Sequence, residues 1–313
     1  MILKHQLQGL LAGSLVVMLA AGCGALAGDA ATVPPPSSSP TAEANIGASG
    51  STCPAVTGSD HLARVCRAGA LVVSTDPAYP PQSALNEETG EFEGFDIDVA
   101  AEIASRLGLE IRFETPLFED VDAGDWSGRW DVSVGSVTVT EDRKGRLDFT
   151  RPYYFTPAQL AVRTGSGIDS VPELAGETIC VAEATTYAAW LDGSLQLAEE
   201  AGRMSDPPAG VEVTTLPTDL DCAESWRSGL GTFAGWLSSI TTVDAAVDHG
   251  YPVEPIGEPV FFEPLAVAFD QSVPDNDSLV AGVDRILAAM HADGTLSAFS
   301  RKWYGGQDLT RQE

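Results

Sequence analysis

Three consecutive segments constrain the fold of this chain more than any other feature of its sequence. A β-branched run over 71–75 ends in the turn-rich stretch DPAYPP, and apolar residues alternate with polar ones over 109–113. Between them, apolar residues recur every four positions in a predicted helix that has Asp96 as its N-cap and ends at Gly108. The order strand, helix, strand predicts a parallel βαβ unit with a right-handed crossover.

The same pattern continues along the chain and predicts a second α/β lobe. Helices are predicted after Glu183, over 240–247 and over 279–290. Further strands are predicted over 178–182, 211–216, 232–237 and 263–270. The fold class is therefore α/β, with a mainly parallel sheet and flanking helices in each of two lobes.

The stretch DVSVGSVTV (131–139) changes its alternation halfway along. Its first two valines share one parity and its last two share the other. We predict that the strand ends near Gly135, that a loop follows, and that Thr140 caps a short helix containing Arg143. A glycine kink inside one longer strand is the alternative.

The chain is strongly acidic, with 45 Asp and Glu residues against 17 Lys and Arg residues and a formal net charge of -28. Phosphate backbones and anionic lipid surfaces would be repelled. These numbers therefore argue against nucleic-acid binding, and against membrane binding by charge alone. Most of the carboxylates are expected on a surface adapted to solubility or salt.

The N-terminus predicts export. Lys4 precedes an apolar run over 7–21 that is too short to span a bilayer comfortably, so residues 1–22 are expected to be a signal peptide. The stretch MLAAGC resembles a bacterial lipobox, which would make Cys23 the lipidated first residue of the mature chain; an ordinary signal peptide is the alternative. Residues 23–52 are rich in Pro, Ser, Gly and Ala and predict a flexible tether. We expect a protein anchored by lipid at the outer face of the cytoplasmic membrane.

The remaining four cysteines predict two disulfides. An exported protein meets an oxidising setting, and neighbourhood in the sequence favours Cys53 with Cys66 and Cys180 with Cys222. A metal site is the competing interpretation, but the chain has no CxxC pair and its four histidines are scattered. We therefore expect neither a metal nor a cofactor.

Polar and aromatic residues follow the predicted strands of both lobes. Ligands of open α/β sheets bind at the carboxyl ends of the strands. An arginine beside hydroxyl groups can bind a carboxylate with two parallel hydrogen bonds, and threonines at a helix N-terminus would add the helix dipole. Aromatic rings would enclose an apolar or planar part of the ligand, and an aspartate would bind a polar group. The candidate ligand-binding residues are Asp76, Tyr79, Phe118, Ser136, Thr138, Arg143, Thr185 and Thr186.

Each candidate also has a purely structural explanation. Arg143 could lie on the surface beside its solvated basic neighbours, and Tyr79 and Phe118 could be core aromatics. Thr185 could serve only as a helix cap. The shared position of these residues at strand ends favours a ligand site.

The chain contains, in this order, LVVSTDPAYPP, GFDIDVAAEIASRLGL, SVTVTEDRKGRLDFTRPYY, ELAGETICVAEATT and MHADGTLSAFSRKWYG. In order and spacing these segments resemble the family 3 extracellular solute-binding proteins of ABC importers for polar amino acids, over about residues 67–306. The resemblance implies a type II periplasmic-binding fold, in which two α/β lobes are joined by two hinge strands and close over the ligand. On this basis we expect lobe one to comprise 53–157 and 263–313, and lobe two to comprise 158–262.

The resemblance also implies a role for the candidates. Thr138 and Arg143 would bind the α-carboxylate of an amino acid, and the carbonyl of Ser136 would accept a hydrogen bond from the α-ammonium group. Thr185 would add a contact from lobe two. The residues that would face the ligand side chain are Asp76, Tyr79 and Phe118.

One position departs from the family. Members carry an aspartate in lobe two that neutralises the α-ammonium group, whereas this chain has Leu237 in the corresponding stretch TFAGWLSS. A buried ammonium group without a partner would be costly. Either another acid, such as Glu183, replaces the aspartate, or the ligand lacks a standard α-amino group.

The expected function is that of a monomeric substrate-binding lipoprotein that captures a polar amino acid or a related carboxylate and delivers it to an ABC permease with its ATPase. Hinge closure around the ligand is the expected mechanism. Two alternatives are a receptor that reports to a sensor and an exported enzyme similar to cyclohexadienyl dehydratases. The sequence lacks a nucleophile elbow, a P-loop and a metal-ligand cluster, which disfavours the enzyme.

Overall fold

The structure of the protein is a computed structural model that describes residues 53, 58–198 and 204–311. The predicted signal peptide (1–22) and tether (23–52), including the lipidation site Cys23, lie outside the described residues. Within the described ranges, no helix is both long enough and apolar enough to span a bilayer.

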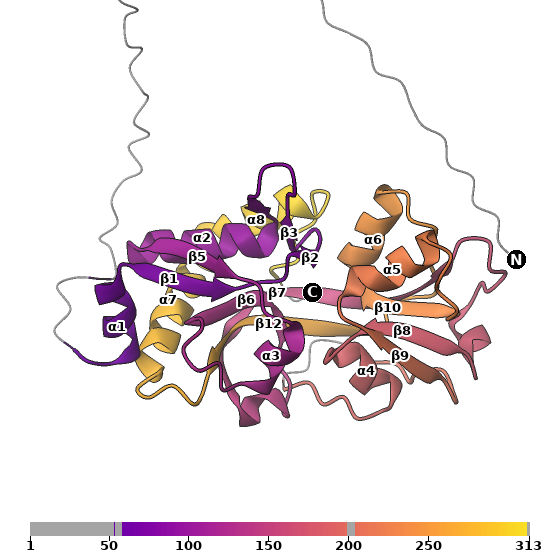
Figure 1. Ribbon diagram of the computed structural model, residues 1–313, viewed down its shortest axis with the longest axis horizontal. Coiled ribbons are helices and arrows are strands. Elements are labelled where there is room, and N and C mark those ends of the chain that lie inside the picture. Colours follow the sequence, from indigo (N-terminus) through magenta and orange to yellow (C-terminus); the bar gives the residue numbers. More distant parts are fainter. Residues whose placement is uncertain (1–52, 54–57, 199–203, 312–313) are drawn as a thin grey trace, which may run out of the picture. The chain divides into compact units, whose positions relative to one another are not determined.

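Most strands of the described residues belong to one mixed sheet, whose order is β5-β1-β6-β12-β7-β10-β8-β9, with β11 beside β7 (Figure 1). Its strands are β1 (Ala70–Ser74), β5 (Glu110–Glu114), β6 (Val132–Thr138), β7 (Leu147–Arg163), β8 (Thr178–Ala182), β9 (Glu212–Leu216), β10 (Gly235–Ser239), β11 (Val253–Pro255) and β12 (Phe261–Asp270). A small second sheet contains β2 (Ala78–Tyr79), β3 (Ser83–Leu85) and β4 (Phe92–Glu93).

The large sheet is parallel on both sides and antiparallel in the middle. We call β5, β1 and β6 the first strand group, and β10, β8 and β9 the second strand group; pairing is parallel within each group. The central strands β12 and β7 pair antiparallel with each other, and each pairs antiparallel with one group. The parallel pairing of β1 with β5 confirms the predicted βαβ unit. The residue boundaries predicted for the two lobes stay a prediction.

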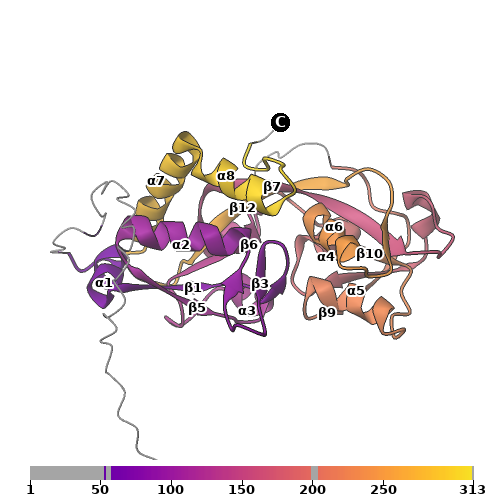
Figure 2. The same ribbon diagram turned by 90° about the horizontal axis from the view of Figure 1, so that it is seen from above.

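Helices cover both strand groups. They are α1 (His61–Ala68), α2 (Phe95–Leu107), α3 (Phe118–Ala123), α4 (Thr186–Leu191), α5 (Asp219–Arg227), α6 (Ile240–Asp248), α7 (Asp277–Asp293) and α8 (Thr295–Trp303), with short 3-10 turns η1 (Arg143–Gly145) and η2 (Val171–Leu174). Figure 2 shows α2, α7 and α8 on one side of the first strand group. The apolar stripe predicted for the C-terminal helix is buried in the core beneath them: Leu279, Val283, Ile286, Leu287 and Met290.

The predicted N-cap of α2 is wrong. The helix begins after Gly94, which has a φ of 138° and whose added Cβ would lie 2.2 Å from the carbonyl oxygen of Gln82. Only glycine fits this close approach. Asp96 therefore lies inside the first turn, fully buried. The predicted end at Gly108 is correct, with that residue in the left-handed conformation.

The predicted end of the third strand near Gly135 is also wrong. Strand β6 continues to Thr138, and the change of alternation coincides with Ser136, which has a φ of 56°. The pairing of β6 with β12 shifts register in the same region. A kink within one strand, which was the alternative, accounts for both observations.

Candidate functional site

One cavity brings together all of the candidate residues. It has a volume of about 40 Å³, which leaves room for roughly one water molecule. Its walls come from the ends of β1 and β6 in the first strand group, and of β8 and β9 in the second. The predicted residues that line it are Asp76, Tyr79, Phe118, Ser136, Thr138, Arg143, Thr185 and Thr186. Their binding roles stay predictions.

Arg143 is held rigidly at the wall of this cavity and is only 4% exposed. Its Nε donates to Asp122 Oδ1 at 2.7 Å, Nη1 to the carbonyl of Thr138 at 2.9 Å, and Nη2 to the carbonyl of Ala184 at 2.9 Å. Its guanidinium carbon lies 5.2 Å from the centroid of the Phe118 ring. Three of five N–H groups thus have partners among the described residues, which leaves two for a ligand.

The turn that carries Arg143 separates it from its basic neighbours. The backbone N–H of Arg143 donates to Thr140 Oγ1 at 3.1 Å, but η1 begins after Asp142, which is its N-cap, so Thr140 contacts this turn without being the predicted cap. Lys144 is exposed, whereas Arg146 donates to the carboxylate of Asp122 at 2.7 Å. The three basic residues of this turn therefore differ: Arg143 is buried, Lys144 is exposed, and Arg146 shares the carboxylate of Asp122 with Arg143.

Glu263, which the sequence interpretation missed, accepts hydrogen bonds from hydroxyl groups that were expected to bind a ligand carboxylate. It is 2% exposed, and its carboxylate accepts hydrogen bonds from Thr138 Oγ1 at 2.7 Å, from Tyr187 OH at 2.9 Å and from Thr186 Oγ1. Burial raises the pKa of Glu263 in spite of these bonds. The available signal was an acid near the start of β12, followed by six uncharged residues before the terminal Asp270.

Asp219 is a second acid that the sequence interpretation missed. It is the first residue of α5, is 7% exposed, and its Oδ1 has no hydrogen-bond partner among the described residues. Burial, together with the charges of Asp76 and Glu263, raises the pKa of Asp219 to about 8. Helix α5 begins after Thr218, and its first turn contains Asp219 and Asp221. Acids are favoured in the first turn of a helix, so the sequence pattern offered no reason to assign Asp219 to a ligand site.

Asp76, by contrast, was predicted to lie at the site, and one of its carboxylate oxygens has a hydrogen-bond donor. Its Oδ1 accepts a hydrogen bond from the backbone N–H of Ala78 at 2.7 Å. Burial raises the pKa of Asp76 as well. Three carboxyl groups thus line the cavity: Asp76, Asp219 and Glu263.

Neither position considered for the missing acid faces the cavity. Leu237 is fully buried in an apolar cluster with Leu160 and Phe261, so an acid at position 237 would not reach a ligand here. Glu183 is partly exposed and does not line the cavity. A ligand ammonium group at this cavity would need another partner.

A buried polar network fixes the kinked residue Ser136. Its backbone N–H donates to Tyr153 OH at 3.1 Å, its Oγ donates to Asp96 Oδ2 at 2.7 Å, and this Oγ also lies 2.6 Å from Tyr154 OH. Burial raises the pKa of Asp96 to about 7. These bonds offset the cost of a positive φ at a non-glycine residue.

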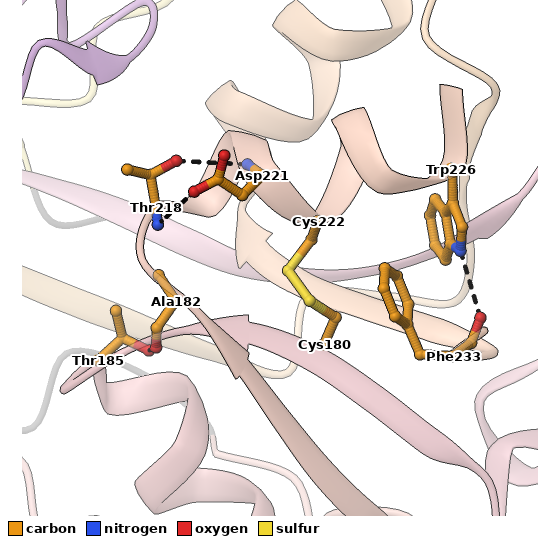
Figure 3. Close-up of a disulfide and its surroundings, with 8 residues drawn as sticks. All are labelled: Cys180, Ala182, Thr185, Thr218, Asp221, Cys222, Trp226 and Phe233. Carbon is orange, nitrogen blue, oxygen red and sulfur yellow. Dashed lines mark hydrogen bonds between the residues drawn. A yellow bond between two sulfur atoms is a disulfide. The ribbon is translucent and has the colours of Figure 1, made fainter. Parts of the chain in front are cut away.

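A disulfide joins the two elements that bring the second strand group to the cavity (Figure 3). Cys180 lies in β8, whose end leads to Thr185, and Cys222 lies in α5, whose first residue is Asp219. The hydroxyl of Thr185 donates to the carbonyl of Ala182 at 2.8 Å. The other disulfide joins residues 53 and 66, so the structure contains both predicted pairs.

Known proteins resemble this chain over most of its length. The L-cystine-binding protein TcyJ of Escherichia coli (strain K12) is 28% identical over 252 residues, which are 80% of this chain and 88% of that protein. The histidine-binding periplasmic protein of Salmonella typhimurium (strain LT2) is 26% identical over 74% of this chain and 86% of its own length.

Solved structures have the same fold. The crystal structure of Tv2483 bound to L-arginine has a TM-score of 0.67 and 26% identity, covering 80% of this chain and 96% of that chain. An ancestral arginine-binding protein bound to arginine has a TM-score of 0.65 and 28% identity, covering 76% and 99%. These similarities confirm the two-lobed α/β fold. Residues 71–306 match the family described as bacterial extracellular solute-binding proteins, family 3, and the chain belongs to that family.

Proposed function

We propose that this protein is the substrate-binding lipoprotein of an ABC importer, which captures a small carboxylate-bearing solute, in the first place an amino acid, and delivers it to a membrane permease. The observation that carries the proposal is the cavity, where Arg143 has two N–H groups left and residues from both strand groups meet. Relatives named for binding L-cystine and histidine, and structures containing arginine, support an amino acid as the ligand.

Capture requires movement, because the cavity of about 40 Å³ has no room for an amino acid. The ligand carboxylate would bind Arg143 and Thr138, and would replace the carboxylate of Glu263 on the hydroxyl of Thr138. A ligand that contacts both strand groups binds the closed arrangement better than an open one. It therefore shifts the equilibrium toward closure.

The proposal includes the location and the partners. Cys23 would carry the lipid and residues 23–52 would tether the folded body to the outer face of the cytoplasmic membrane. The monomer would then meet a permease and its ATPase at that surface. The acidic chain, with its net charge of -28, would not adhere to anionic lipid by itself.

Replacement of Arg143 tests the assignment. We expect Arg143→Ala to lose about 3 kcal/mol or more of binding free energy, since the ligand carboxylate would be left without its cation. The fold should persist because Arg146 still neutralises Asp122. The amino acid is first found by a thermal-shift panel, and its affinity is then measured by calorimetry.

The matched control is Lys144→Ala, which removes an exposed cation from the same turn. It should bind like the parent protein. Unchanged affinity in Arg143→Ala would overturn the assignment of the site.

A further inference from the structure

The cavity has a surplus of acidic groups, and this observation extends the proposed function on which it rests. Asp76, Asp219 and Glu263 line the cavity, and Arg143 is the sole cationic side chain among the described residues that do so. That cation is already paired with Asp122. A ligand with equal positive and negative charge would leave the surplus uncompensated.

Among the three acids, Asp219 gives the clearest indication that the cavity binds a positively charged group. Its Oδ1 is buried and has no hydrogen-bond donor among the described residues, although the side chain lines the cavity. An ionised carboxylate with a buried oxygen that no donor meets is costly, so the ligand-free protein favours the protonated form of Asp219, and a cationic ligand would stabilise the ionised form. Burial is the main cause of the raised pKa of each of the three acids.

Aromatic groups complete the surroundings of these acids. The hydroxyl groups of Tyr79 and Tyr187 lie 3.5 Å apart, and Tyr187 OH donates to Glu263. Asp219 and Glu263 both act on Tyr79, whose pKa is raised mainly by burial and further by their charges. Aromatic faces beside carboxylates suit a cationic nitrogen on a partly apolar stem.

We propose that the ligand is an amino acid with net positive charge, whose carboxylate binds Arg143 and whose side-chain cation binds Asp219 at the N-terminal end of α5. Asp76 and Glu263 face the α-ammonium group, for which position 237 supplies no acid.

Matched ligands test the proposal by calorimetry on the full chain at pH 7. Lysine is compared with norleucine, and arginine with citrulline, because each pair differs mainly in one charge. We expect the cationic member to bind about tenfold to a hundredfold more tightly. Asp219→Asn should remove this preference and leave the neutral members almost unaffected. Glu183→Gln, which changes an acid outside the cavity, should retain the preference.

Two outcomes separate this inference from the proposed function. If neutral amino acids bind as tightly as their cationic partners, and Arg143→Ala still removes binding, the inference fails while the proposed function stands. If Asp219→Asn keeps the full preference for the cationic member, the assignment of Asp219 fails. If no amino acid binds the parent protein, both fail.

Discussion

At the scale of single residues, the negative charge that our proposal requires of Asp219 also destabilises the ligand-free protein. The pKa of Asp219 is raised from 3.8 to about 8, so the folded state holds a proton that the unfolded state releases. The stability that this group contributes is therefore fully present below about pH 4 and is lost as the pH rises toward 8. Asp219→Asn should remove this loss. The ligand-free variant should melt above the parent protein at pH 8, by about 2–4 °C for each kcal/mol gained.

Thermal denaturation between pH 5 and pH 8.5 measures this difference. Glu183→Gln is the control, because its acid lies outside the cavity, and its melting temperature should follow that of the parent protein. A ligand-free Asp219→Asn protein that melts at or below the parent temperature at pH 8 would contradict the prediction. Such a result would mean that Asp219 is stabilised by a contact in the folded state.

The sequence predicted the candidate residues better than it predicted their partners. Residues at strand ends, such as Thr138 and Arg143, could be placed because the carboxyl ends of parallel strands meet. Glu263 and Asp219 could not, since groups that act on them, such as Thr138 on Glu263 and Asp76 on Asp219, lie far away along the chain. A local pattern cannot show that three carboxyl groups from different elements share one cavity.

At the scale of elements, the βαβ unit and the C-terminal helix were predictable from periodicity, whereas β7 was not. This strand contains Pro152 and Pro157, and prolines argue against a strand inside a sheet. In the structure β7 accommodates Pro152 where its pairing with β12 shifts register on both sides of Ala266, whereas Pro157 lies opposite Phe262 in a regular part of the pairing. Such bulges depend on the neighbouring strand and leave no periodic signal.

The disulfide between β8 and α5 supports the site as well as the fold. It spans 42 positions, for which loop closure predicts about 4 kcal/mol of stabilisation. We expect the double variant Cys180→Ala, Cys222→Ala to lose about this much, measured by urea denaturation. It should also bind the ligand more weakly, because β8 leads to Thr185 and α5 begins at Asp219.

The second disulfide provides the matched control. Cys53 and Cys66 are 13 positions apart, and neither lines the cavity. The double variant of these two residues should lose stability but keep its affinity in calorimetry. Equal losses of affinity in both double variants would show that the effect comes from general destabilisation and not from the position of β8 and α5.

At the scale of the whole folded body, the described residues adopt a closed arrangement, in which hydrogen bonds join segments beside the first strand group to segments beside the second. Gln82 Nε2 donates to Ser239 Oγ at 3.1 Å and to Thr241 Oγ1 at 2.7 Å. Glu263, from the central strand β12, joins Thr138 at the end of β6 to Thr186 at the start of α4. The two-lobed fold could be predicted from the sequence, but these contacts depend on how the groups approach each other.

Glu263 should therefore hold the ligand-free protein closed. Its carboxylate accepts three hydrogen bonds, and a hydrogen bond to a charged group contributes about 1.5–3 kcal/mol. Glu263→Gln removes the negative charge and replaces one acceptor oxygen by an N–H donor, which weakens these bonds. Loss of a single bond would shift the equilibrium between closed and open forms toward the open forms by about tenfold or more. Small-angle X-ray scattering should show a larger radius of gyration for the ligand-free variant, and saturating ligand should restore the parent value.

The exposed Glu258 provides a control in the segment before β12. Glu258→Gln should scatter like the parent protein with and without ligand. If ligand-free Glu263→Gln has the parent radius of gyration, the contacts of Gln82 are sufficient to keep the two groups together. If the ligand-free variant is open and ligand closes it, the carboxylate of Glu263 links Thr138 to Thr186 in the ligand-free protein, and the ligand provides the link in the complex. The hydroxyl of Thr138 would then serve both carboxylates in turn.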